Sequence, residues 1–283
     1  MGTSVMFGIK LRWRAAIHLL LAILGVLFFF PFYWMFVQST HTSLEILRTP
    51  PPVFFGGSLA ANYRAMMDVI PFWRNFANSL FVSAATTTLS LLFCSMGGYA
   101  FAMYSFPGKK ALFNILLLTM MLPWIVSLIP WFIIMSRLGW VDRLAALIVP
   151  GAANAFGIFW MRQYIGSHVP KDLLHSARID GCPEGLIFFR IFLPLLTPAL
   201  GALGILNFLN SWNNFFFPMV VLQTKGKFTI PLALRYLNAD PYKGMDFGVT
   251  MLGASMAVIP ILVVFWAASR QFISGLTAGA LKE

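Results

Sequence analysis

The chain has 283 residues, of which 59% are hydrophobic and only 10% are charged, and its mean hydropathy is +0.79. Soluble domains carry about 25% charged residues, so this composition excludes an ordinary soluble protein and indicates an integral membrane protein. The formal net charge is +11. Because the basic residues are scattered among loops and form no stripe, we expect no nucleic-acid partner; the charge suits membrane topology and anionic lipid instead.

Six apolar runs are long enough to cross about 30 Å of hydrocarbon as helices. They cover residues 15–37, 76–103, 111–135, 144–162, 195–222 and 247–269. The sequence therefore predicts an all-α integral membrane protein with six transmembrane helices, which form a single transmembrane domain over residues 1–283. The first run is too long for the apolar core of a cleaved signal peptide, so we expect it to be retained as a span.

The distribution of Lys and Arg predicts a cytoplasmic N-terminus. Eleven of the twenty basic residues then lie inside, and the Lys109-Lys110 pair sits close to a span end, where the positive-inside rule has most force. This orientation also predicts a cytoplasmic C-terminus, outer loops near 38–75, 136–143 and 223–246, a cytoplasmic loop at 163–194, and a cytoplasmic tail at 270–283. The proline run at 49–52 cannot be helical and should be extended.

The predicted spans hold no Asp, Glu, Lys or Arg well inside them. Ion-coupled carriers usually keep such groups near the midplane, so this argues against one. The chain also lacks a GxxxxGK[ST] phosphate-binding loop, and its four His and two Cys residues show no catalytic set or metal-ligand spacing. We therefore expect no catalytic residue, no metal site and no cofactor on this chain. Any energy for transport would come from another protein.

A polar face follows the fifth run. At 100° per residue, four polar side chains share one side of a helix, namely Asn207, Asn210, Ser211 and Asn214, whereas Asn213 does not. An amide in a lipid-crossing helix must face protein or water. Two interpretations stay open: the wall of a translocation path, in which amides bind sugar hydroxyls, or hydrogen bonding between helices, worth about 0.6 kcal/mol per contact. In the second run, Gly97-Gly98 predicts close helix packing.

The segment from Val169 to Leu200 is a moderately polar insert in an otherwise apolar sequence. Pro170 suits the first turn of a short helix, and Gly181 can take the left-handed conformation that ends it. Pro183 suits the first turn of a second helix. The insert is either an amphipathic pair lying on the membrane surface or a rigid projection that fits a cleft on a soluble partner.

Residues 170–181 read PKDLLHSARIDG, and IFLP follows at 191–194. This pattern resembles the EAA loop of binding-protein-dependent ABC importer permeases, most closely the carbohydrate subgroup typified by the second membrane subunit of the maltose system. GLTAGALK at 275–282, Ser211-Trp212-Asn213 with Pro218, and FPGK at 106–109 resemble other parts of that subgroup. The resemblance covers essentially the whole chain, in order.

The resemblance implies the type I ABC importer permease (MetI-like) core, in the cytoplasmic (inner) membrane of a bacterium. It implies a second related permease subunit, two ATPase subunits that bind ATP and Mg²⁺, and an extracytoplasmic solute-binding protein contacted by the outer loop at 223–246. The cargo would be a sugar, oligosaccharide or related polyol. The residues it places against the ATPases are Leu174, His175, Ser176, Ala177, Asp180, Gly181 and Pro194 in the loop, and Gln271, Gly275, Leu276 and Thr277 in the tail.

One position departs from the family pattern. The loop of this family usually begins Glu-Ala-Ala, but here those places are His175, Ser176 and Ala177. The acidic contact is lost, although a His can donate a hydrogen bond or, when protonated, pair with a carboxylate. The alternative function is a stand-alone solute channel or facilitator, in which the large inner insert has no purpose. The sequence leaves open whether the solute is a neutral sugar, an acidic oligosaccharide or a phosphorylated polyol.

Overall fold

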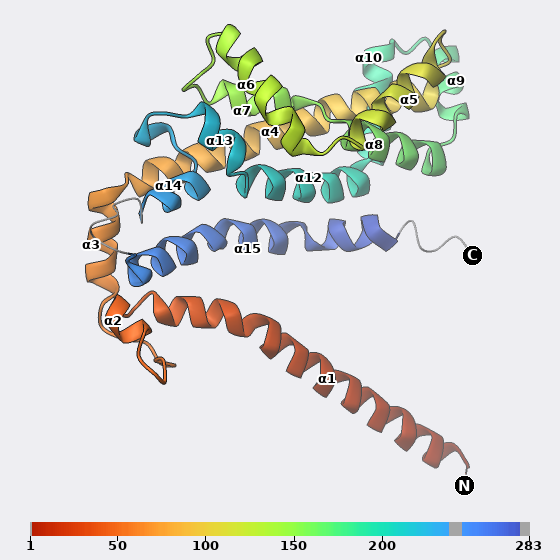
Figure 1. Ribbon diagram of the computed structural model, residues 1–283. Coiled ribbons are helices and arrows are strands. Elements are labelled where there is room, and N and C mark those ends of the chain that lie inside the picture. Colours follow the sequence, from red (N-terminus) through yellow and green to blue (C-terminus); the bar gives the residue numbers. More distant parts are fainter. Residues whose placement is uncertain (1, 238–244, 278–283) are drawn as a thin grey trace. The chain divides into compact units, whose positions relative to one another are not determined.

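The computed structural model describes residues 2–237 and 245–277, and every regular element within them is a helix (Figure 1). The all-α prediction is confirmed. The chain forms two compact units. One comprises Met1–Val69 and Tyr236–Val258, and the other comprises Ile70–Arg235 and Ile259–Glu283.

The first unit contains α1 (Gly2–Gln38), α2 (Ser43–Ile46), α3 (Leu59–Val69) and the first part of α15 (Phe247–Thr277). The turn after α1 organises it. The buried Asn62 amide donates to the carbonyls of Ser39 and His41, each at 2.9 Å. A Cβ on Gly248 would lie 2.2 Å from the His41 carbonyl oxygen, so only glycine allows this approach.

The segment at 49–52 is not helical, as its prolines predict. It folds back onto the end of α1, where the Gln38 amide donates to the Pro52 carbonyl at 3.0 Å and the Tyr33 hydroxyl donates to the Val53 carbonyl at 2.8 Å. Proline has no N–H, so a proline run offers its own carbonyls few backbone donors. These side-chain bonds supply the missing donors.

The second unit is built along α4 (Phe72–Met103), whose main neighbours are α8 (Ala155–His168) and α12 (Thr197–Trp212). A Cβ on Gly98 would lie 2.5 Å from the Met161 Cβ and 2.8 Å from the Arg162 backbone nitrogen, so the backbones of α4 and α8 nearly touch. On α8, Gly157 meets Cys94 in the same way, at 2.6 Å. The packing role predicted for Gly97-Gly98 is confirmed.

Apart from the later part of α15, the remaining helices of the second unit are short. Before α8 come α5 (Lys109–Met120), η1 (Trp124–Ser127), α6 (Leu128–Arg137), α7 (Ala145–Ile148) and η2 (Pro150–Ala152). After α8 come α9 (Asp172–Ile179), α10 (Glu184–Leu186), η3 (Ile187–Phe192) and α11 (Leu193–Leu195), and after α12 come α13 (Phe216–Val221), η4 (Lys225–Lys227) and α14 (Ile230–Tyr236).

Three of the six apolar runs are not single straight helices. In the run at 111–135, the chain turns by 99° between α5 and the helices after it, at a break that contains Pro123, which has no N–H to donate. In the run at 144–162, α7 and η2 precede α8, which Asn154 caps. In the run at 195–222, the chain leaves the helix between α12 and α13.

Within residues 2–237 and 245–277, four helical segments are long and apolar enough to span a membrane, and counting each bent pair as one span raises that number to as many as six. They include residues 16–38 of α1, the whole of α4, α7 to α8, and residues 247–267 of α15. A six-span topology therefore fits the helices, and its exact limits stay a prediction.

The glycine contact predicts opposite effects for two alanine substitutions. Gly98→Ala forces a methyl into the α8 backbone and should destabilise the fold by about 1–3 kcal/mol, as overpacking does. Gly166→Ala, on the exposed side of α8, meets nothing within 4 Å and should gain up to about 1 kcal/mol of helix propensity. Thermal unfolding of the detergent-solubilised protein measures both, and an unchanged midpoint for Gly98→Ala would contradict the close α4–α8 contact.

Candidate functional site

The polar insert folds as two short helical segments joined by a tight turn, as its prolines and glycine predict. α9 carries Asp172 in its first turn and Arg178 in its last, the signs that the helix dipole favours. After the turn, Pro183 precedes α10, and the chain continues through η3, a π-helical segment, into α11. Pro194 lies just beyond the π turns and cannot donate a hydrogen bond to the preceding helix. We call residues 172–192 the α9–η3 hairpin.

Gly181 makes the reversal of the α9–η3 hairpin possible. Its φ is +74°, in the left-handed region that favours glycine. The Gly181 N–H donates to the Arg178 carbonyl and the Cys182 N–H donates to the Ala177 carbonyl, both at 3.0 Å. This pair of bonds is the Schellman motif, which satisfies the last carbonyls of α9. The predicted left-handed glycine is confirmed.

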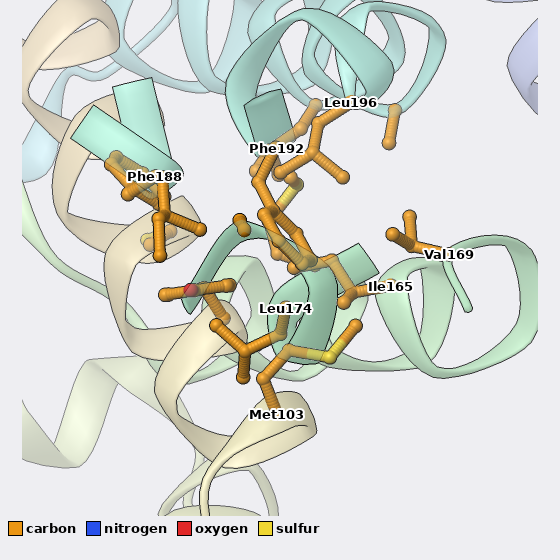
Figure 2. Close-up of a cluster of buried hydrophobic side chains, with 14 residues drawn as sticks. Met103, Ile165, Val169, Leu174, Phe188, Phe192 and Leu196 are labelled. Atoms are coloured by element: carbon orange, nitrogen blue, oxygen red, sulfur yellow. The ribbon is translucent and has the colours of Figure 1, made fainter. Parts of the chain in front are cut away.

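One face of the hairpin is seated in a hydrophobic cluster (Figure 2). Leu174 and Ala177 of α9 are 2% and 5% exposed. The cluster draws residues from α4, α8, α9, η3 and α12: Cys94, Tyr99, Met103, Met161, Ile165, Val169, Leu174, Ala177, Ile187, Phe188, Phe192, Leu196, Ala199 and Leu203. Leu174 and Ala177 are two of the seven loop residues that the resemblance places against the ATPases. Here their buried side chains hold α9 against the hydrophobic cluster instead.

The opposite face of the hairpin is exposed. His175, Ser176, Asp180 and Gly181 all lie there, and Ile179 between them is 86% exposed. Three further large apolar side chains are 38–50% exposed on the same insert: Leu173, Leu186 and Phe189. Apolar groups at the surface of an otherwise polar segment mark a contact surface for another molecule. Pro194 is also exposed, on α11.

A polar brace links the two halves of the hairpin to the end of α4. The Arg178 guanidinium donates to Glu184 Oε1 from Nε at 2.7 Å and pairs with the same oxygen from Nη2 at 2.6 Å. The Tyr104 hydroxyl donates to Glu184 Oε2, and the Arg178 Cζ lies 5.4 Å from the Tyr104 ring centroid. Since Arg178 and Glu184 are exposed, the brace orients the hairpin more than it stabilises the fold.

The brace also sets the charge of its carboxylate. The hydrogen bond from Tyr104 is the largest influence, and with Arg178 it lowers the pKa of Glu184 despite some desolvation. Sequence reasoning missed this group. The available signal was an Arg near the end of one helix and a Glu at the start of the next, but nothing in the sequence indicated that Tyr104 would lie beside them.

The polar side chains of the fifth run do not act as one face. Asn207 donates to the Ser90 hydroxyl of α4 at 2.9 Å, and Asn154, at the start of α8, donates to the same oxygen at 3.0 Å. Ser90 is 1% exposed. Asn207 therefore joins three helices through a buried contact, which is the helix-packing interpretation for this residue.

The other three residues of the predicted face differ from Asn207. Asn210 is exposed and Ser211 is half-buried, and within the described residues neither side chain makes a hydrogen bond. The common helical face is wrong for Asn214, because α12 ends at Trp212. The Asn213 amide bonds the Leu209 carbonyl at 3.0 Å, and Asn214 Oδ1 accepts the Phe217 N–H at 3.3 Å. Such side-chain bonds compete with continued helix.

A cavity of about 260 Å³ lies at this helix break. Aromatic and polar groups line it together: Ser127, Trp131, Ala146, Leu147, Pro150, Gly151, Asn214 and Phe217. The rings of Trp131 and Phe217 meet edge to face, 4.8 Å apart. A few polar groups in an apolar wall are typical of small-molecule sites. Sequence reasoning placed Asn214 on a path but did not foresee the residues of η1, α6 and α7 around it.

The predicted outer loop at 223–246 is anchored at its start by Asp142. Asp142 Oδ1 accepts the N–H groups of Gln223 and Thr224, both at 3.0 Å, and Oδ2 accepts Lys227 Nζ at 2.8 Å and the Thr224 hydroxyl at 2.7 Å. Burial alone would raise the pKa of the Asp142 carboxyl, but these bonds outweigh it and hold the pKa well below its ordinary value. From α4, the Asn75 amide also binds the Lys225 carbonyl at 2.8 Å.

Two predicted regions lie partly outside the described residues. These are positions 238–244 of the outer loop and positions 278–283 of the tail. The tail expected from residue 270 begins within α15, so Gln271, Gly275, Leu276 and Thr277 have helical backbone. Within the described residues, no group of three or more His, Cys, Asp or Glu side chains is placed to hold a metal ion.

Comparisons with known proteins agree over nearly the whole chain. Residues 94–272 match the family described as binding-protein-dependent transport system inner membrane component. The chain is 37% identical to the arabinooligosaccharides transport system permease protein AraQ of Bacillus subtilis (strain 168), over 95% of this chain and 96% of that protein. It is 35% identical to the lactose transport system permease protein LacG of Rhizobium radiobacter, over 90% and 92%.

A solved structure shares the fold. It is the crystal structure of a bacterial ABC transporter involved in the import of the acidic polysaccharide alginate, and one of its chains matches with a TM-score of 0.78. The match covers 96% of this chain and 98% of that chain at 24% sequence identity. The expected permease core is thereby confirmed as a fold.

The Asp142 anchor predicts a local pH response. Folding lowers the pKa of the Asp142 carboxyl below its ordinary value of about 3.8. The hydrogen bonds of the carboxylate therefore stabilise the folded protein fully above about pH 3.8, and this stabilisation is lost as the pH falls through the folded pKa. Asp142→Asn keeps a residue that tolerates the φ of 60° at this position. It should lower the free energy of unfolding by about 1–2 kcal/mol. Protection of the Gln223 and Thr224 amides from hydrogen exchange, relative to the intrinsic rate at each pH, should then be lower and should not change further in acid. Equal protection in both proteins would contradict the anchor.

Proposed function

Because the chain belongs to the family of binding-protein-dependent transport system inner membrane components, we propose that it is the permease subunit through which an ATP-driven importer moves a sugar or oligosaccharide. Its relatives carry names that specify arabinooligosaccharides, lactose and diacetylchitobiose. One relative at 29% identity, from Rhizobium meliloti, is named for sn-glycerol-3-phosphate, so a phosphorylated polyol is the alternative cargo.

The working assembly that we propose has this chain beside a second related permease, two ATPase subunits on the cytoplasmic side and a solute-binding protein outside. ATP and Mg²⁺ belong to the ATPase subunits, since this sequence has no phosphate-binding loop of its own. Both termini lie in the cytoplasm in this arrangement. The outer loop that Asp142 anchors would meet the binding protein.

The observation that carries the proposal is the two-faced α9–η3 hairpin. Its buried face, centred on Leu174, packs against the ends of α4 and α8, and the Arg178–Glu184–Tyr104 brace ties it to α4 again. Because the hairpin is fixed to α4 by both contacts, a force on its exposed face would move α4 with it. Packed elements of this kind transmit motion as rigid bodies. The exposed face is where we place the ATPase.

His175 occupies the place of the usual family glutamate on this exposed face. Its ring is free to meet a partner because α9 turns it away from the hydrophobic cluster. We propose that it donates a hydrogen bond to the ATPase, in place of the acidic contact. Gln271, Gly275, Leu276 and Thr277 at the end of α15 would supply a second contact with the ATPases.

The sugar path that we propose runs past Asn210 and Ser211 to the cavity beside Asn214. Amides and hydroxyls both donate and accept, as sugar hydroxyls require, and the Trp131 and Phe217 rings offer apolar faces. At about 260 Å³ the cavity is smaller than the roughly 300–1,000 Å³ of pockets for drug-sized ligands. It therefore suits one sugar ring at a time. Asn207 is a packing residue beside this path.

The hairpin predicts that side chains at Gly181 uncouple transport. Among the described residues other than its two chain neighbours, no atom lies within 4 Å of a Cβ built there, so we expect a new side chain to project toward the partner. Gly181→Val should lose about 1–2 kcal/mol to backbone strain as well, whereas Gly181→Asn tolerates the left-handed backbone. We expect both variants to assemble but to lose at least about tenfold of binding-protein-stimulated ATPase activity, about 1.4 kcal/mol of coupling.

The matched control is Gly139→Asn. Gly139 also has a positive φ, of 66°, and nothing within 4 Å of its Cβ, but it lies in the turn after α6. Stimulated ATPase activity and uptake, measured in reconstituted vesicles, should be retained. Full activity in Gly181→Asn would place the ATPase contact elsewhere on the chain.

The polar path predicts that two asparagines behave differently. Asn210→Leu should keep the unfolding midpoint and reduce uptake about fivefold or more, the effect of losing about 1 kcal/mol of hydrogen bonding. Asn207→Leu should instead lower the midpoint, because the buried Ser90 hydroxyl loses the hydrogen bond that Asn207 donates. Uptake of radiolabelled lactose and arabinooligosaccharide tests this. If the protein transports sn-glycerol-3-phosphate but neither sugar, the proposed cargo class is wrong. If solute passes without ATP, a facilitator is favoured instead.

A further inference from the structure

Three cations, to which the proposed function assigns no role, gather where α4 and α8 end and α5 begins. A cavity of about 450 Å³ there is lined by Phe101, Ala102, Lys109, Arg162, Gln163, Gly166, Ser167 and Lys171. Among the described residues lining it, none is acidic. Like charges gathered around one cavity repel one another, so an anion bound there would be stabilised.

Two of the cations are held in position by other groups. The Arg162 guanidinium lies 4.0 Å from the Phe113 ring centroid, and its Nη1 donates to Gln163 Oε1 at 3.0 Å. Lys109 Nζ donates to the Tyr104 carbonyl at 2.7 Å. Each retains further N–H donors, since Lys has three and Arg has five. Donors that are already oriented lose less entropy when they bind an anion.

An apolar groove continues from the same two cations. This second cavity, of about 980 Å³, is lined by Phe106, Gly108, Lys109, Lys110, Ala111, Phe113, Asn114, Leu117 and Arg162. Outside this lining, Leu112, Ile115 and Leu118 of α5 are 53%, 57% and 61% exposed. Their spacing of three residues puts them on one side of the helix. In a membrane protein such a side faces acyl chains.

We propose that this double cavity binds an anionic phospholipid, with the lipid phosphate among Lys109, Arg162 and Lys171 and an acyl chain in the groove along α5. A soluble phosphate would satisfy the cations but leave the groove unfilled, and an acidic protein segment would do the same. A phospholipid can fill both cavities, because its anionic headgroup and its acyl chain are covalently joined and the two cavities share Lys109 and Arg162. Juxtamembrane cations attract anionic headgroups with about 1 kcal/mol each.

The inference goes beyond the proposed function and needs only a membrane-embedded chain. The test compares the purified importer complex with its Lys109→Gln, Arg162→Gln and Lys171→Gln triple variant in nanodiscs of phosphatidylcholine and phosphatidylglycerol. Native mass spectrometry counts the phosphatidylglycerol that stays bound. We expect about fivefold weaker retention for each cation removed and about a hundredfold for all three, which the per-cation attraction predicts.

The matched control removes three exposed cations outside both cavities, with Arg48→Gln, Arg137→Gln and Arg143→Gln, and should retain lipid like the wild type. Equal retention in the two triple variants would overturn the proposal. Displacement of the lipid by millimolar inorganic phosphate would reassign the site to a soluble anion. A crosslink from Lys109 to an ATPase subunit, with no bound lipid, would reassign it to a protein contact. Uptake of sugar is not a readout, so the outcome is independent of the cargo.

Discussion

The backbone contact between α4 and α8 is the constraint on which the second unit depends. Gly98 leaves no room for a Cβ beside Met161, and Gly157 leaves none beside Cys94. With the helices this close, the ends of α4 and α8 form one apolar floor that receives Leu174 of the hairpin. The same approach brings Arg162 over the Phe113 ring of α5 and completes the basic cavity. The seat of the hairpin and the basic cavity thus both follow from one close packing.

Local signals in the sequence were sufficient for the hairpin. Pro170, Gly181 and Pro183 act through their own backbone preferences, so the two short helices and the left-handed turn could be predicted. The break at Pro123 also has a local cause, because proline has no N–H to donate. The breaks beside Asn154 and Asn214 could not be predicted, because Asn207 and Asn210 are also asparagines and yet remain within α12. Hydropathy gives the length of an apolar run. It does not indicate where a side-chain oxygen accepts a backbone N–H in place of a helical carbonyl and so ends the helix.

The candidate site shows the same division. The exposed and buried faces of α9 follow from helical spacing, which separates His175 and Ile179 from Leu174 and Ala177. The bonds from Tyr104 to Glu184 and from Gln223 to Asp142 join residues 80 or more positions apart. Such pairings are created by the fold. Charge patterns along a single sequence carry no record of them.

The bond that Asn207 and Asn154 share at Ser90 has a consequence for motion. It ties α12 and the start of α8 to the middle of α4, so these three helices form one block. Two of the helix breaks among the described residues, around Pro123 and around Asn213, lie at the edge of this block or beyond it, and hinges lie at such element ends. The cavity beside Asn214 lies at the second of these hinges. Bending there would open and close the cavity.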